Sequence, residues 1–264
     1  MAFSGCSAKI QNIAVSVFNI PTDEPESDGT LEWDHTTLVL VEATAANTCG
    51  LGYSYADRAT AILVQDVLAP IVEGRDAMDV RGAWSAMVSA IRNLGRPGIA
   101  SMAIASVDNA LWDLKARLLG IPLAKLLGVV RESIPVYGSG GFTSYSDAQL
   151  QRQLARWAEC GIEMVKMKVG RKPEDDVRRM QIARDAIGER AALFVDANGA
   201  YSRKQALELA QQFHDRGVSW FEEPVSSDDL AGLRLIRNRA AGRNGDRRWG
   251  VWVRCPLLSP HAGS

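Results

Sequence analysis

Two lysines stand one residue apart in the segment "MVKMKVG", residues 164–170. Apolar residues alternate with them, which predicts a β-strand. Side chains alternate between the two faces of a strand, so Lys166 and Lys168 share one face. Like charge and desolvation disfavour the ammonium form of a lysine placed beside another lysine and a metal, which would lower its pKa towards the range of a general base. The pair therefore predicts proton-transfer chemistry.

Carboxylates follow at the ends of the next two predicted strands. Asp196 ends "ALFVD" and Glu222 ends "VSWFE", each about one strand–helix unit after the preceding residue of the set. Because functional groups collect at the carboxyl ends of strands in such folds, we expect these residues to lie at similar heights beside Lys168. Two carboxylates suit Mg²⁺, a hard cation that takes oxygen ligands and keeps some waters. We expect Lys168 to take a proton, Lys166 to tune it and contact the substrate, and a metal to stabilise the resulting anion.

Each of these residues also has an ordinary structural interpretation. The two lysines fit a solvated edge strand, because lysine is seldom buried. Asp196, in "DANG", fits a turn or a helix N-cap. Glu222 and Glu223 fit the favourable charge at a helix N-terminus. Their occurrence in order on three consecutive predicted strands favours a site.

Strands and helices alternate regularly from about residue 133. The predicted strands are "IPVYGSGG", "MVKMKVG", "ALFVDANG" and "VSWFEEPV", and the predicted helices are 146–160, 174–188, 203–216 and 228–239. This alternation indicates βαβ units and a parallel sheet. Four such units are visible, whereas a closed (β/α)₈ barrel needs eight.

The first half of the chain is predicted as α+β. Residues 8–20 and 36–44 alternate like antiparallel strands, and the Pro-, Asp-, Glu- and Ser-rich stretch between them predicts a mobile loop. Helical periodicity follows at 56–73, 78–93 and 100–119.

Composition argues against several classes of partner. Lys and Arg number 30 and Asp and Glu 31, so bulk charge favours neither nucleic acid nor a membrane. The four cysteines form no CxxC pair, and the N-terminal segment lacks the pattern of a signal peptide. We find no uninterrupted apolar run long enough to span a membrane. The sequence predicts a cytoplasmic protein.

The segments "KMKVG", "VDANGAY" and "FEEPV", in this order and spacing, resemble the mandelate racemase/muconate lactonizing enzyme family of the enolase superfamily. Residues 105–128 are similar to the helix and turn that join the capping domain to the barrel in that family. The resemblance covers roughly residues 8–239. It implies an α+β capping domain at 1–130, followed by a truncated TIM-type (β/α)₈ barrel at 131–240.

The resemblance also implies roles for single residues. Lys168 would abstract the proton α to a substrate carboxylate, with Lys166 assisting. Members of this superfamily use a Lys or His base together with Mg²⁺. One Mg²⁺ would be held by Asp196, Glu222 and a third carboxylate from the next strand. A loop around residues 21–30 would close over the substrate. Substrate binding is assigned to three side chains near the strand ends: Asn198, Tyr137 and Ser139.

The resemblance further implies a reaction class. Family reactions include acid-sugar dehydration, racemisation, epimerisation and cycloisomerisation. We expect an acid-sugar dehydratase or racemase acting on a small carboxylate, a sugar acid, and the family alone suggests a homo-oligomer. The alternatives are a non-catalytic remnant that serves as a binding or oligomerising module, and a muconate-type cycloisomerase that uses the same lysine pair.

The family pattern stops after residue 239. The third carboxylate is expected near position 247, where the sequence has Arg247 and Arg248. Residues 241–264 are therefore predicted to be an aberrant tail, and activity is expected to be severely impaired or absent. The alternative is an Arg-rich extension that binds nucleic acid or a partner, although the tail lacks any helical or repeat pattern.

A frameshift accounts for this tail. Re-read from the second base of each codon from Arg243 onward, with allowed codons, the tail becomes "GMEIAAGEYGYDAPYFRRMLEA". That string has an apolar strand ending in Gly-Glu where the family places its third metal ligand, and helix-like sequence follows. One extra base near the codons for Ala240 and Ala241 would produce the observed tail, so we expect the chain to be out of frame there.

Overall fold

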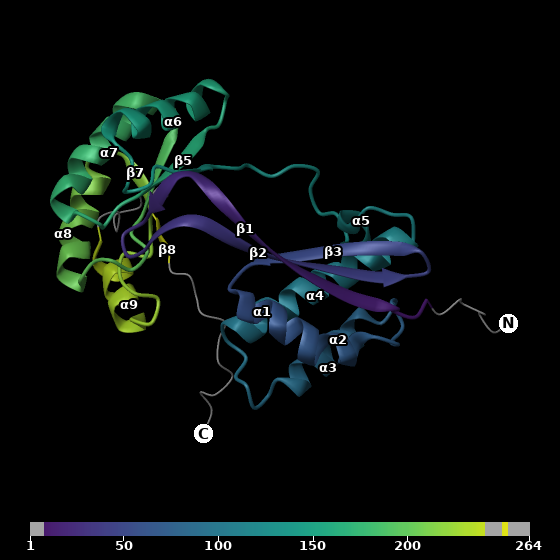
Figure 1. Cartoon of the computed structure of the whole chain (residues 1–264). Coiled ribbons are helices and arrows are strands. Elements are labelled where there is room, and N and C mark those ends of the chain that lie inside the picture. The colour runs from purple at the N-terminus through teal and green to yellow at the C-terminus, as the bar shows by residue number, and fades with distance from the viewer. Residues whose placement is uncertain (1–7, 241–249, 253–264) are drawn as a thin grey trace. The chain divides into compact units, whose positions relative to one another are not determined.

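The computed structural model describes residues 8–240 and 250–252. Contacts within the chain divide it into two compact units (Figure 1). The first unit holds the residues up to Thr22 and His35–Ser133. The second holds Asp23–Asp34 and the residues from Ile134 onward.

A three-stranded sheet and a set of helices make up the first unit. The sheet has the order β1-β2-β3, with strands β1 (Asn12–Ser27), β2 (Glu32–Ala45) and β3 (Thr48–Tyr55). The ends of β1 and β2 next to their turn, within Asp23–Asp34, belong to the second unit. The helices are α1 (Arg58–Leu63), the π-helical turn η1 (Val64–Leu68), α2 (Ala69–Val72), α3 (Val80–Ala90), α4 (Ile99–Leu118) and α5 (Leu123–Leu127). Buried residues such as Val41, Leu68, Met87 and Leu111 form its core. This is the α+β arrangement predicted for the first half.

The segment between residues 20 and 36 was predicted to be a mobile loop, but most of it forms the hairpin of strands β1 and β2. The strands continue to Ser27 and from Glu32, so only four residues remain as a turn. Asp28 closes that turn, because its Oδ1 accepts hydrogen bonds from the amides of Thr30 and Leu31, each at 2.7 Å. The polar composition predicted a loop, while "DG" is itself a hairpin-turn signal.

Strand β3 was not predicted, and its glycines explain why. Gly50 and Gly52 interrupt the apolar alternation that predicts a strand. A Cβ at either position would overlap the backbone of α4, which packs directly on this strand. The two glycines therefore serve close helix–sheet packing.

A five-stranded parallel sheet dominates the second unit. Its order is β4 (Gly138–Gly140), β5 (Met164–Lys168), β6 (Ala192–Asp196), β7 (Val218–Glu222) and β8 (Gly250–Trp252). The intervening helices are α6 (Asp147–Glu159), α7 (Pro173–Ile187), α8 (Arg203–His214) and α9 (Leu230–Arg239). Together they give the four predicted βα units, with the helices along one side of the sheet (Figure 1).

The helix-facing side of this sheet is the core of the second unit. Strand residues at alternate positions are fully buried against the helices: Val165, Met167, Leu193, Val195 and Phe221. The opposite side carries the lysines and carboxylates. The period-2 pattern of the strands therefore separates packing from chemistry.

Strand β8 was not predicted either. It belongs to the segment predicted to be an aberrant tail, and the remaining residues of that segment lie outside the described ones, as do Arg247 and Arg248. Among the described residues, no helix is both long and apolar enough to cross a membrane.

Candidate active site

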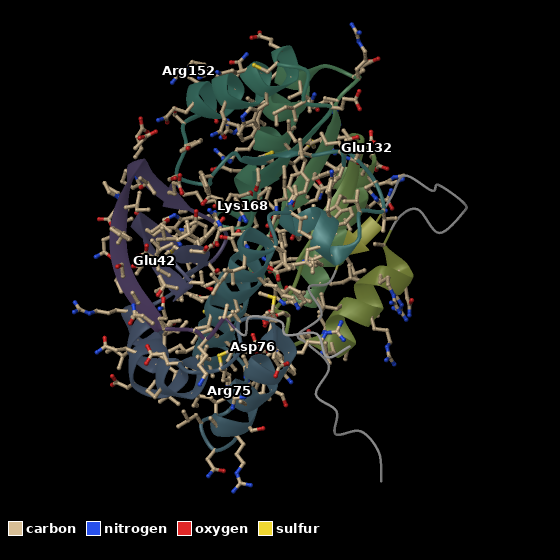
Figure 2. The ribbon with its side chains drawn as sticks, turned by 90° about the vertical axis from the view of Figure 1, so that its right-hand side faces the viewer. Glu42, Arg75, Asp76, Glu132, Arg152 and Lys168 are labelled. Carbon is tan, nitrogen blue, oxygen red and sulfur yellow. The ribbon has the colours of Figure 1, made fainter. Side chains whose placement is uncertain are left out.

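Strand β5 brings both lysines into the interior of the sheet. It pairs with β4 on one side and with β6 on the other, so the edge-strand interpretation of the lysines is wrong. Lys166 is only 7% exposed. Lys168, labelled in Figure 2, is the last residue of β5 and has a side chain that is 14% exposed.

The strand register places the candidate residues in one row. Lys168 pairs with Asp196, and Asp196 pairs with Glu222. All three are the last residues of adjacent parallel strands. Asp196 is not a helix N-cap, since Ser202 caps α8, and Glu222 lies well before α9, which Asp229 caps.

Ion pairs connect the four charged side chains of this row. Lys166 Nζ lies 2.6 Å from Glu222 Oε2 and 3.1 Å from Asp196 Oδ2. Lys168 Nζ lies 2.7 Å from the same Asp196 oxygen and donates a second hydrogen bond to Asn198 Oδ1 at 3.0 Å. The Asn198 amide in turn donates to Asp196 Oδ1 at 3.0 Å, which is the predicted turn role of Asp196. One carboxylate thus joins both lysines.

The charge state of Lys166 follows from these contacts. Burial alone would lower the pKa of Lys166, but the hydrogen bond to Glu222 and the negative charge of Asp196 outweigh burial and raise that pKa above its usual value. Lys166 therefore remains an ammonium at neutral pH. Its chemistry is that of a fixed positive charge rather than of a base.

The two other predicted substrate-binding residues lie beside Lys166. The Tyr137 ring centroid is 5.3 Å from Lys166 Nζ, a cation–π distance. Ser139 of β4 pairs in register with Lys166 and is exposed. Tyr137 also contacts the ring of Phe194, which contacts Trp220, at centroid distances of 5.7 Å each. An aromatic wall thus lies next to the charged row.

The hairpin turn between β1 and β2 packs against the strand ends of the same unit. Thr143 Oγ1, after β4, donates to the Asp28 carbonyl at 2.8 Å and shares a 2.6 Å hydrogen bond with Ser27 Oγ. Gly29 has no room for a side chain, because a Cβ there would overlap the carbonyl oxygens of Val169 and Ala197. The segment predicted to close over the substrate therefore contacts the ends of β5 and β6.

Two non-glycine residues at the strand ends adopt left-handed backbone conformations. Asn198 has φ of 49° and Glu223 has φ of 42°. The Gly199 amide donates to the Glu223 carbonyl at 2.8 Å, which ties the two turns together. Such conformations are costly outside glycine and concentrate at functional sites.

The donor set at this row suits a hard cation. Asp196 and Glu222 both direct an oxygen to the same ammonium nitrogen, so their carboxylates converge on one positive charge. Mg²⁺ is commonly held in proteins by one or two carboxylates with waters completing the shell, and this pair fits it. Within residues 8–240 and 250–252 there is no group of three or more His, Cys, Asp or Glu able to hold a metal. The residue that pairs with Glu222 on β8 is Trp252, which has no carboxylate.

Buried polar residues behind the site escaped the sequence analysis. Asp176 is 1% exposed and accepts hydrogen bonds from the Gly170 amide and the Tyr201 hydroxyl, at 2.9 and 2.5 Å. A signal was available, because Asp176 lies on the same helical face as Met180 and Ala183, which are apolar and buried. An acid on such a face needs buried partners.

Two family models match the chain. Residues 149–252 match the enolase C-terminal domain-like model, and residues 13–128 match the N-terminal domain of mandelate racemase/muconate lactonizing enzyme. Together with the capping-type first unit and the barrel-like second unit, these matches define an enolase-superfamily fold. The chain belongs to the mandelate racemase/muconate lactonizing enzyme family, as the motifs indicate.

Solved structures and curated proteins agree with this assignment. A mandelate racemase/muconate lactonizing enzyme-like protein from Rubrobacter xylanophilus is 55% identical, with a TM-score of 0.87 over 89% of this chain and 66% of that one. A racemase from Streptomyces coelicolor with bound magnesium is 32% identical, with a TM-score of 0.84 over 88% and 67% of the two chains. L-talarate/galactarate dehydratase from Salmonella typhimurium is 35% identical over 188 residues, which are 69% of this chain and 47% of that protein.

The relatives are lyases and isomerases. They comprise sugar-acid dehydratases, cycloisomerases and racemases. This chain spans about half the length of the dehydratases that it matches.

Proposed function

We propose that this protein catalyses Mg²⁺-dependent abstraction of the proton α to the carboxylate of a sugar acid, leading to dehydration or racemisation. The observation that carries the proposal is the row of Lys168, Asp196 and Glu222 at adjacent strand ends, with Lys166 beneath it. Sugar-acid dehydratases among the relatives support the substrate class.

The two lysines have different tasks in this proposal. Lys168 acts as the free amine, and its Nζ takes the α-proton and becomes an ammonium. It stands at the strand end, where Asp196 and Asn198 accept hydrogen bonds from Nζ and hold it in place. Lys166 keeps its proton and presents positive charge to the substrate carboxylate. Asp196 and Glu222 would hold Mg²⁺, which supplies stabilisation of the negative charge that develops on the substrate when the proton leaves.

A small polar cavity supports a polyhydroxylated substrate. It has a volume of about 190 Å³ and borders Asn198, the partner of Lys168. Its lining is Thr30, Asn198, Gly199, Glu223, Ser226 and Ser227. Hydroxyl, amide and carboxylate groups of this kind donate and accept hydrogen bonds with the hydroxyls of a sugar acid.

We also propose the domain organisation that the motifs imply. A capping domain spans residues 1–130 and a partial (β/α) barrel spans 131–240. With two carboxylates in the described row, Mg²⁺ is held more weakly than by three, and we expect activity to be low and to require millimolar Mg²⁺.

The test uses the full chain and a panel of aldonic and aldaric acids at high Mg²⁺. Dehydration yields a 3-deoxy-2-keto acid, which semicarbazide detects by absorbance. We expect product with the wild type and none with Lys168→Ala or with EDTA. Product formed equally well by Lys168→Ala would contradict the proposal. Lactone formed from cis,cis-muconate alone would favour a cycloisomerase, and a chain that neither turns over any acid nor binds Mg²⁺ would be a non-catalytic remnant.

A further inference from the structure

Helix α7 buries two charged side chains on its apolar face. Asp176 is 1% exposed and Arg179 is 7% exposed, in line with Met180 and Ala183. Charged side chains are almost never buried unless they are paired. The hydrogen bonds of both side chains go to other residues than the lysines and carboxylates of the row, so that row does not account for their burial.

Asp176 joins the loops that follow β5 and β6. A single carboxylate oxygen, Oδ2, accepts hydrogen bonds from the Gly170 amide at 2.9 Å and from the Tyr201 hydroxyl at 2.5 Å. Gly170 stands two residues after Lys168, and Tyr201 stands three residues after Asn198. The carboxylate therefore ties together the two loops that directly follow Lys168 on β5 and Asp196 on β6.

Arg179 extends the same connection to the loop after β4. Its two terminal nitrogens donate to the carbonyls of Phe142 and Tyr145, at 2.8 and 2.9 Å. Asp176 lies three residues earlier on α7, and its negative charge interacts favourably with Arg179. Three consecutive strand-end loops are thus fastened to the first turns of one helix.

The fastened loops have little room to move independently. Gly170 has φ of 102°, and a Cβ there would lie 2.7 Å from the Ala200 Cβ and 3.4 Å from the Gly29 Cα. The loops after β5 and β6 and the β1–β2 turn therefore touch at backbone distance. A shift of one of them is passed to the next.

We propose that Asp176 is a positioning residue, which holds the loops after β5 and β6 so that Lys168 Nζ stays within hydrogen-bond distance of Asp196 and Asn198. The catalytic role of Asp176 rests on the proposed function. The structural part, the fixed spacing of two loops, stands on the contacts of Asp176 alone.

The experiment measures amide hydrogen exchange by mass spectrometry on the full chain. The variants are Asp176→Ala, which removes the shared acceptor, and Tyr201→Phe, which removes one hydroxyl. Asp175→Ala is the matched control, because it removes an acidic side chain from the same helical turn without touching Gly170 or Tyr201. Helix α4 of the first unit is the internal reference.

Exchange in peptides covering 169–171 and 197–201 should quicken at least tenfold in Asp176→Ala and severalfold in Tyr201→Phe. The control should stay within twofold of the wild type, and α4 should not change. Unchanged exchange in these peptides, or equal acceleration over the whole chain, would overturn the proposal. If Asp176→Ala does not fold, the exchange rates of Tyr201→Phe in the same peptides decide whether the proposal holds.

Turnover separates this inference from the proposed function. If the wild type processes a sugar acid, Tyr201→Phe should lower kcat about tenfold and change KM less than twofold, since the base is displaced while binding groups remain. An equal change in both constants would overturn a positioning role. If the wild type is inactive, the proposed function fails, and the exchange data still decide whether Asp176 fixes the loops.

Discussion

Lys166 has its ammonium group between Asp196 and Glu222, with all three side chains largely buried. Removing Lys166 leaves the Glu222 carboxylate without this ammonium partner, while Asp196 keeps its ion pair with Lys168. We expect Lys166→Met to lower the free energy of unfolding by about 3 kcal/mol in Mg²⁺-free buffer. Urea unfolding measures this change.

The control for that variant is Lys204→Met on the surface of α8. The Lys204 side chain is 86% exposed, and its nitrogen lies as far as 3.9 Å from Glu208. Its loss should therefore lower the free energy of unfolding by less than about 0.5 kcal/mol. A similar small loss in Lys166→Met would mean that the buried cluster contributes nothing to stability.

Asp176 makes stability depend on pH. Burial raises the pKa of the Asp176 carboxyl, and the hydrogen bonds from Tyr201 and Gly170 oppose that rise without cancelling it. Between the unfolded pKa near 4 and the higher native pKa, the folded chain holds a proton that the unfolded chain has lost. The contribution of this group to stability is therefore present at low pH and is lost as pH rises through that window.

Asp176→Asn removes this titration. As pH rises from about 4, the unfolding free energy of the wild type should fall relative to that of Asp176→Asn. The difference should become constant above the native pKa. Urea midpoints at a series of pH values measure it. A difference that stays flat, or that moves in favour of the wild type, would show that the pKa of Asp176 is not raised.

Among the structural elements, the β1–β2 turn has no room for added volume. Gly29 faces the carbonyls of Val169 and Ala197 with no space for a methyl group. Gly29→Ala should lower the free energy of unfolding by about 1–3 kcal/mol through overpacking. It should also expose residues 23–34 to proteolysis. Asp23→Ala, at an exposed position of the same hairpin, is the control, and equal behaviour of the two variants would refute close packing of Gly29.

The elements of the second unit were largely predictable, and some of the first were not. Period-2 strands alternating with amphipathic helices predicted each βα unit to within a few residues, because burial on one side of the sheet imposes that pattern. Strand β3 and the long β1–β2 hairpin were not predicted, because the glycines and an acidic residue there make tertiary contacts, such as the ion pair of Glu32 with Arg171. Local composition does not report such contacts.

The candidate site was predictable as a set of residue types but not as a network. Spacing alone put Lys168, Asp196 and Glu222 at adjacent strand ends. The spacing did not reveal that Lys166 bridges both carboxylates. Strand register determines which residues lie side by side on adjacent strands, but it does not determine which side chains contact each other. Asp176 was missed because three acidic residues in the first turn of α7 resemble ordinary helix-terminal charge.

At the scale of the whole molecule, the proposed metal site couples binding to stability. A ligand at a hundred times its Kd stabilises the folded state by about 2.7 kcal/mol. We expect Mg²⁺ to raise the unfolding midpoint of the wild type and to have much less effect on Glu222→Gln. Calorimetric scans in EDTA and in Mg²⁺ measure it, with Glu208→Gln as a surface control. Equal Mg²⁺ shifts in wild type and Glu222→Gln would exclude Glu222 as a ligand.

We propose that Lys168 removes the α-proton of a sugar acid with the help of Mg²⁺. The most direct measurement is proton NMR of sugar acids in D₂O with the full chain, following loss of the α-proton signal. We expect Mg²⁺-dependent exchange that falls at least about 100-fold in Lys168→Met, because a general base contributes a rate factor of that order. Exchange that persists in Lys168→Met, or that ignores EDTA, would contradict it.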